Sequence, residues 1–192
     1  MAKKTTKEPD PRLEILKMLT PEQKDKLLLK LFRKEPILME KLAFEFFEDK
    51  SDLEKRRNDL RNQVDKYISE RYLSYPTPGE LMMNLRSISG QITEHVKITK
   101  DKYGEVEINI LMLNTAFERF FPMLTAKVGR SEKFSEYVVK RTITILKLLE
   151  KLHEDNLMDF KDDLNQLFSH LHTYKGTSFL SNANDIPKSL EI

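Results

Sequence analysis

Apolar residues recur at helical spacing along most of this chain. Separations of three and four residues place side chains on one face of an α-helix. The pattern returns in successive segments from Asp10 to Gly176, and Pro or Gly stands at most of the boundaries between them. It predicts an all-α protein of about seven to eight helices, a larger helical share than an average protein has. The expected architecture is an irregular multi-helix bundle or a short HEAT-like stack of antiparallel helix hairpins.

The most apolar stretch is EVEINILMLNTAFERFFPML, residues 105–124. On a helical wheel Val106 and Phe117 lie on one broad apolar face, while Ile108 and Met112 lie on the opposite side. A helix that is apolar on both sides is normally surrounded by other elements. We therefore place this stretch at the centre of the fold and expect Pro122 to end or kink it.

Capping signals divide the rest of the chain into helices. Thr20-Pro21-Glu22-Gln23, Ser51-Asp52-Leu53-Glu54 and Thr77-Pro78-Gly79-Glu80 each resemble a capping box, in which side chains satisfy the first backbone N–H groups. A first short helix should turn Leu13, Leu16 and Leu19 inward. The other expected helices are 21–35, Pro36–Glu48, Ser51 to about Leu73, one from Pro78, Ser131–His153 and one from Asn156 that stops at Gly176.

The segment His95–Ile110 allows two interpretations. Val96, Ile98, Val106 and Ile108 alternate with polar residues around a loop that contains Gly104, which is typical of a β-hairpin. The helical period, however, continues for several turns on each side. We prefer two helices that break at Gly104.

Three segments follow from these boundaries. Residues 1–9 are expected to form a flexible basic tail, and 10–175 a single helical domain. Within that domain, N-terminal helices (10–73) and C-terminal helices (78–175) are joined by a linker at 74–77, in the turn-like sequence SYPTPG. Residues 176–192 should be a loose C-terminal tail.

Charge and cysteine content exclude several classes of protein. The chain has 192 residues, with 33 Lys and Arg against 31 Asp and Glu, so no strong overall field attracts nucleic acid or membrane. It has no Cys, which excludes disulfides, thiolate metal sites and Cys nucleophiles. No apolar segment follows the basic N-terminus, and no apolar run reaches the roughly 18 residues of a membrane span. We expect a cytoplasmic protein that binds no membrane.

The residues that could carry metal chemistry do not complete a site. Glu150 and His153 form one Glu-x-x-His pair, whereas di-iron bundles need two such pairs and two more glutamates. The acidic residues around Asn156 lack the spacing of a calcium-binding loop and suit the start of a helix. Asn109 should satisfy its amide within the core. We therefore expect no catalytic residue, no metal and no cofactor.

One basic cluster could contact a polyanion. Lys55, Arg56, Arg57 and Arg61 lie on the helix predicted from Ser51, and phosphate groups bind where such cations gather on one face. Acidic residues alternate with them along the same helix, so a solvated, ion-paired face is the simpler interpretation.

The stretch Leu19-Thr20-Pro21-Glu22-Gln23 followed by helices resembles some uncharacterised bacterial helical families with HEAT-like hairpins. The resemblance covers mainly residues 13–48 and implies no activity. Three functional hypotheses remain, of which an enzyme with a helical active site is the last. The preferred one is a non-enzymatic helical module or scaffold that binds another protein, and the alternative is an accessory nucleic-acid-binding protein that uses the basic cluster.

Overall fold

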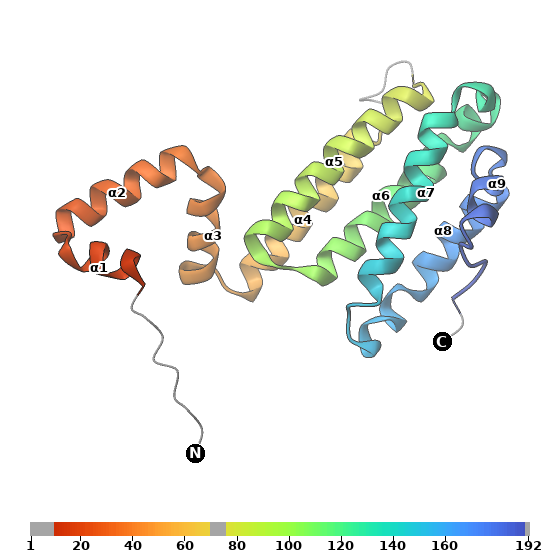
Figure 1. Ribbon diagram of the computed structural model, residues 1–192. Helices are drawn as coiled ribbons and strands as arrows, with labels where there is room; N and C mark the ends of the chain where they lie inside the picture. The colour runs from red at the N-terminus through yellow and green to blue at the C-terminus, as the bar shows by residue number, and fades with distance from the viewer. Residues whose placement is uncertain (1–9, 70–75, 191–192) are drawn as a thin grey trace.

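The computed structural model describes residues 10–69 and 76–190, and these residues form nine α-helices and three short 3-10 helices, with no strand (Figure 1). The predicted all-α class is confirmed, with one or two helices more than expected. The α-helices are α1 (Pro11–Met18), α2 (Pro21–Lys34), α3 (Pro36–Phe47), α4 (Lys50–Tyr67), α5 (Pro78–Thr99), α6 (Lys102–Ala126), α7 (Glu132–Leu149), α8 (Lys161–Thr173) and α9 (Lys175–Ala183). The 3-10 helices are η1 (Val128–Arg130), η2 (Glu154–Asn156) and η3 (Met158–Phe160).

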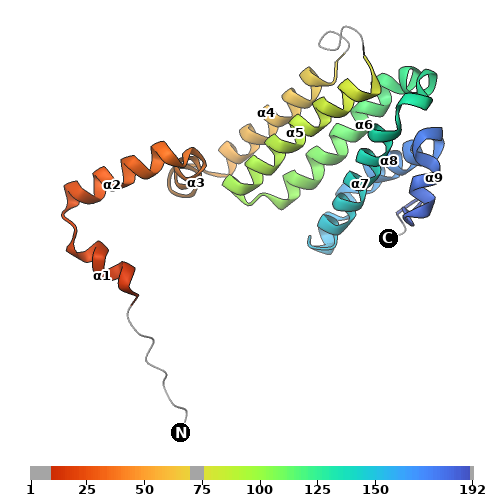
Figure 2. The ribbon, with the colours of Figure 1, turned by 45° about the horizontal axis from the view of Figure 1, so that its top comes forward.

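Helix α6 is the centre of the bundle, as its two apolar faces predict. It packs against α4, α5, α7 and α8, which surround it in both views (Figures 1 and 2). Val106 and Phe117 are buried on one side, and Ile108 and Met112 on the other. Pro122 does not end the helix, which continues to Ala126.

The segment His95–Ile110 is helical, so the β-hairpin alternative is excluded. The break between α5 and α6 lies at Lys100, whose φ of 60° is left-handed, and not at Gly104 as predicted. Asp101 then caps α6 by accepting a hydrogen bond from the Gly104 backbone N–H at 2.9 Å. The side-chain cap of Asp101 therefore starts α6 one turn earlier than the apolar pattern suggested.

Two of the three predicted capping boxes form as expected, at Thr20 with Gln23 and at Thr77 with Glu80. At α4 the prediction was two residues late, because Asp49 is the cap and Asp52 completes the box. Helix α4 ends at Tyr67 and not near Leu73. Residues 70–75, which contain the first half of the expected 74–77 linker, lie outside the described residues, as does the expected 1–9 tail.

The prediction of a loose C-terminal tail is wrong for the described residues 176–190. Gly176 lies inside α9, which packs against α7 and α8 and buries Thr177 and Ser181. Tyr174 anchors its start by donating a hydrogen bond to the Ser131 hydroxyl at 2.6 Å. Farther on, Ile186 is buried and the Leu190 N–H donates to the Asn165 side chain.

Two helix boundaries nearby also differ from the predictions. Helix α7 ends at Leu149 instead of His153. Helix α8 begins at Lys161 instead of beside Asn156, because residues 154–160 form the turns η2 and η3.

Helices α1–α3 form an arm that extends from one end of the bundle (Figure 2). None of these three helices contains a buried residue, and only α3 packs closely on the bundle, against α5. The prediction that Leu13 and Leu16 face inward is wrong, because both are exposed. The core of the described chain therefore lies in α4–α9, and the N-terminal arm, defined as residues 11–47, lies outside it.

Candidate functional site

The four residues of the predicted basic cluster all lie on α4, but the fold turns them in different directions. Lys55 pairs with Asp52 of its own helix, and Arg56 forms two hydrogen bonds with Glu48, just before α4. Arg57 and Arg61 point instead to carboxylates on and beside α6. A phosphate group would have to compete with these ion pairs. Binding of a polyanion by the cluster stays a prediction.

A buried polar cluster joins three helices through Asp101. Its two carboxylate oxygens each accept a hydrogen bond from Arg57 at 2.7 Å, and Oδ2 also lies 3.1 Å from Nε2 of His95. Only 3% of the Asp101 side chain is exposed, against 17% for Arg57. Gly104 fits beneath the pair, where a Cβ atom would lie 2.1 Å from Asp101 Oδ2.

Electrostatics keep Asp101 ionised. Burial by itself raises the pKa of this carboxyl, but hydrogen bonds from His95, Arg57 and the Gly104 N–H outweigh burial and hold the pKa well below its ordinary value. An ionised carboxylate only accepts hydrogen bonds, so Nε2 of His95 carries the proton between them.

The chemistry available to this cluster is limited by what surrounds the imidazole. No side-chain hydroxyl hydrogen-bonds to the His95 ring within 10–69 and 76–190, so no nucleophile completes a triad there. Arg57 also lies over the Tyr103 ring, with Cζ 5.1 Å from its centroid. We interpret the Arg57–Asp101 pair as the bond that ties α4 to the start of α6.

Sequence reasoning missed this cluster, although it grouped Arg57 with the basic residues of α4. A usable local signal was present, because Asp101 stands three residues before Gly104 at the start of a helix. The partner on α4 is 44 residues away in the chain, and no local pattern identifies it.

The candidate metal residue His153 lies at the surface. It pairs with Asp155, with 3.2 Å between Nδ1 and Oδ2. In the part of the chain that the structure describes, no three His, Asp or Glu side chains are placed to hold a metal ion. Asn109 is satisfied as predicted, because its amide donates to the Glu105 carbonyl and accepts from Arg141 Nε.

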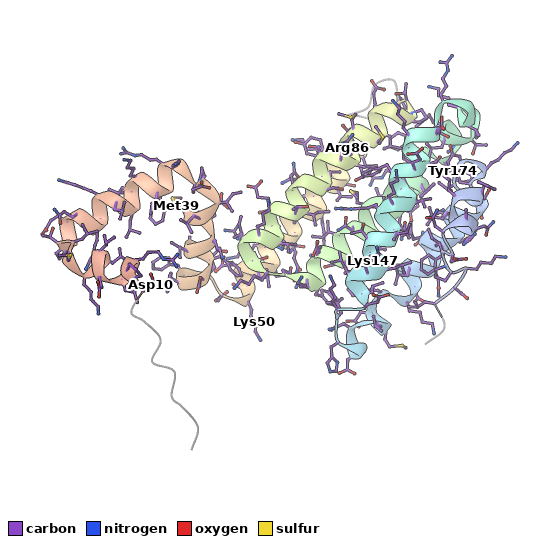
Figure 3. All side chains as sticks on the ribbon, in the orientation of Figure 1. Asp10, Met39, Lys50, Arg86, Lys147 and Tyr174 are labelled. Carbon is purple, nitrogen blue, oxygen red and sulfur yellow. The ribbon has the colours of Figure 1, made fainter. Side chains whose placement is uncertain are left out.

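The N-terminal arm carries the most unusual surface. Among the described residues, twelve of the sixteen exposed large apolar side chains belong to it. Figure 3 shows side chains of α1 and α2 extending into space that no other drawn element fills, and Met39 of α3 is labelled there. The twelve are Leu13, Ile15, Leu16, Met18, Leu27, Leu28, Leu29, Leu31, Ile37, Met39, Phe46 and Phe47.

The arm also carries charge on α2. Five cations, Lys24, Lys26, Lys30, Arg33 and Lys34, share this helix with two acids, Glu22 and Asp25. By contrast with the arginines of α4, none of these five forms an ion pair with a described residue. Helix α2 is therefore amphipathic, with apolar leucines and basic residues both exposed.

Comparison with known proteins identified no relative of this chain. No family model matches the chain, and neither the curated proteins nor the solved structures contain a match. The resemblance of residues 13–48 to bacterial helical families stays a prediction. Within the described ranges, no helix has the length and apolar character to cross a bilayer.

Proposed function

We propose that the protein is a non-enzymatic helical interaction module and that its N-terminal arm binds another protein. The observation that supports this most directly is the exposure of Leu27, Leu28 and Leu31 along one side of α2, at the spacing that buries leucines elsewhere in the chain. Exposed apolar patches of this kind mark interaction sites in soluble proteins.

Burial of the exposed apolar surface of the arm would stabilise a complex. Burial of apolar surface stabilises a complex by about 25 cal/mol per Å² before the costs of association are subtracted. An amphipathic helix gains this stabilisation when its apolar face enters a groove or meets another helix. The arm offers three short helices in succession, all with large apolar side chains in solvent.

The charge of α2 indicates the chemistry of the partner. Free cations beside an apolar face favour a partner that has apolar residues flanked by Asp and Glu, because complementary charge speeds encounter and selects the partner. The proposed ligand of the arm is therefore an acidic amphipathic helix of another protein. Nothing in the geometry favours nucleic acid over this ligand, since the cations of α4 are already paired.

The experiment compares captured proteins across matched variants. Tagged full-length protein is incubated with native lysate, and bound proteins are quantified by mass spectrometry for wild type, Leu28→Ser with Leu31→Ser, and Lys26→Glu with Lys30→Glu. Phe179→Ser is the control, because Phe179 is a highly exposed apolar residue on α9, outside the arm. We expect an acidic protein to be retained by wild type and the control and lost from both arm variants.

Two results would contradict the proposal. One is retention of the same proteins by the arm variants and wild type. The other is a homodimer in light scattering that Leu28→Ser with Leu31→Ser dissociates, because a second copy of the chain would then cover the arm.

A further inference from the structure

Helices α5 and α7 pack against each other, and the hydroxyl oxygens of Ser89 and Tyr137 lie 2.6 Å apart where they meet. Beside this contact both helices turn cations to solvent, and Figure 3 labels one on each helix, Arg86 and Lys147. We call the surface that these cations form the α5–α7 basic face. It consists of Arg86 and Lys97 of α5, Lys133, Lys140 and Lys147 of α7, and Lys151 just after α7.

The lysines of α7 follow one line along the helix. Lys133, Lys140 and Lys147 are each seven residues apart, so they fall within about 40° of one another around the helix and about 10 Å apart along its axis. The row is therefore about 21 Å long. An extended chain of anionic groups can contact all three lysines, whereas a single small anion reaches only one of them.

The acidic residues of α5 and α7 lie beside this face and not within it. Tyr137 marks the side of α7 that meets α5. The acids on and just after α7 lie on the other side of the lysine row, and these are Glu132, Glu136 and Glu150. On α5, Glu94 lines the hollow shared with α3 and α4, and Glu80 completes the capping box of Thr77. The local charge of the face is therefore positive, although the whole chain is nearly neutral.

Most of these cations have no intramolecular partner. Lys140 pairs with Glu136 at 3.2 Å, but 75% of the lysine side chain is exposed, and such pairs are weak. The other five form no ion pair with a described residue. The arginines of α4 differ, because carboxylates already hold them. A phosphate group that meets the α5–α7 basic face would displace at most one weak pair.

The side chains around the cations indicate which polyanion suits the face. Met83 is the only exposed large apolar side chain of α5 and α7, whereas protein partners and membrane surfaces are bound largely through apolar contacts. Single-stranded nucleic acids stack their bases on aromatic side chains. The one aromatic side chain at the edge of the face, Tyr137, is half-buried and hydrogen-bonded to Ser89. A duplex, in which the bases are already stacked, needs only cations that contact its phosphates.

We propose that the α5–α7 basic face binds the phosphate backbone of a nucleic acid duplex without reading its sequence. Lys133, Lys140 and Lys147 contact successive phosphates along the duplex, and Arg86 and Lys97 contact it from the neighbouring helix. This surface is separate from the N-terminal arm, so the inference goes beyond the protein interaction proposed above and does not depend on it.

The proposal is tested on the full chain by fluorescence anisotropy. The probes are labelled DNA and RNA duplexes of about 20 base pairs, which are longer than the face. We expect saturable binding at about 50 mM salt, and a logarithm of the association constant that falls with the logarithm of salt concentration with a slope of about −5, as five or six phosphate contacts require. DNA and RNA duplexes present the same phosphates, and the tighter of the two identifies the source of the ligand.

Removal of the lysine row locates the site. Lys133→Gln with Lys140→Gln and Lys147→Gln changes three exposed positions of α7, and Gln forms helix nearly as well as Lys does. Thermal denaturation should give the same Tm as for wild type. This triple variant should bind the duplex about tenfold or more weakly and reduce the salt slope by about 3.

A second triple variant controls for total charge. Lys66→Gln with Lys175→Gln and Lys188→Gln removes three exposed lysines from other parts of the bundle and should bind the duplex as wild type does. Four results would overturn the proposal: no saturable duplex binding at about 50 mM salt, equal losses in the two triple variants, tighter binding of the matching single strand than of the duplex, or binding of phosphatidylserine vesicles in place of the duplex.

Discussion

Arg57 and Asp101 are 44 residues apart in the chain, yet Nε and Nη2 of the arginine each lie 2.7 Å from a carboxylate oxygen of the aspartate. The pair joins the middle of α4 to the start of α6, and the same aspartate caps α6 and holds His95 of α5. Three helices of the bundle therefore meet at one carboxylate, and its negative charge is expected to contribute to the free energy of unfolding.

Asp101→Asn should destabilise the protein strongly. Removal of one charge from a buried pair leaves the other uncompensated, which costs about 3–5 kcal/mol in free energy of unfolding. Asp65→Asn is the matched control, because Asp65 pairs with Arg119 but is 72% exposed, and exposed pairs contribute about 1 kcal/mol or less. Urea denaturation of both variants measures the difference. Equal losses in the free energy of unfolding would show that the Arg57–Asp101 pair does not hold α4 against the start of α6.

Acid should unfold the protein partly through the same carboxyl. The folded state lowers the pKa of Asp101 because hydrogen bonds from His95, Arg57 and Gly104 outweigh its burial, while in the unfolded chain this carboxyl titrates near pH 3.9, as a model Asp does. The unfolded state therefore binds more protons below about pH 5, and stability falls as pH decreases. The free energy of unfolding of wild type should decline more steeply between about pH 5 and 2 than that of Asp101→Asn. Parallel declines would refute this role.

Two glycines in helices should respond to alanine with opposite signs. A Cβ atom at Gly104 would lie 2.1 Å from Asp101 Oδ2 and 3.0 Å from Arg57 Nε, so Gly104→Ala displaces the pair. We expect a loss of about 2 kcal/mol or more in unfolding free energy. At Gly90 of α5 the added Cβ meets no atom within 4 Å, and Gly90→Ala should stabilise the protein by about 0.5–1 kcal/mol. Thermal denaturation measures both, and a neutral Gly104→Ala would count against the close packing.

Leucines of the arm and of the core should differ in their effect on stability. Leu28 is exposed on α2, so Leu28→Ser should change the free energy of unfolding by no more than about 0.5 kcal/mol. Leu85 is fully buried on α5, and Leu85→Ala should cost about 2–5 kcal/mol. Denaturant titrations at several protein concentrations make the comparison. A large, concentration-dependent loss for Leu28→Ser would mean that self-association already buries the arm.

The sequence alone was sufficient for the all-α class, for the existence of most of the helices and for the enclosure of α6. Helical spacing and capping residues act within a few positions of one another, so they can be recognised without knowledge of the fold. The two apolar faces of α6, with Ile108 on one and Phe117 on the other, required neighbours on both sides, and the structure provides them.

Only the tertiary structure decided which apolar faces are covered and which charges are paired. Leu28 and Leu85 both belong to helical apolar patterns, but one is in solvent and the other in the core, because periodicity orients a side chain without saying what lies opposite it. The partner of Arg57 and the docking of α9 on α7 likewise depend on segments that are distant in the chain. Contacts between such segments form only when the whole chain packs, and so they leave no local pattern in the sequence.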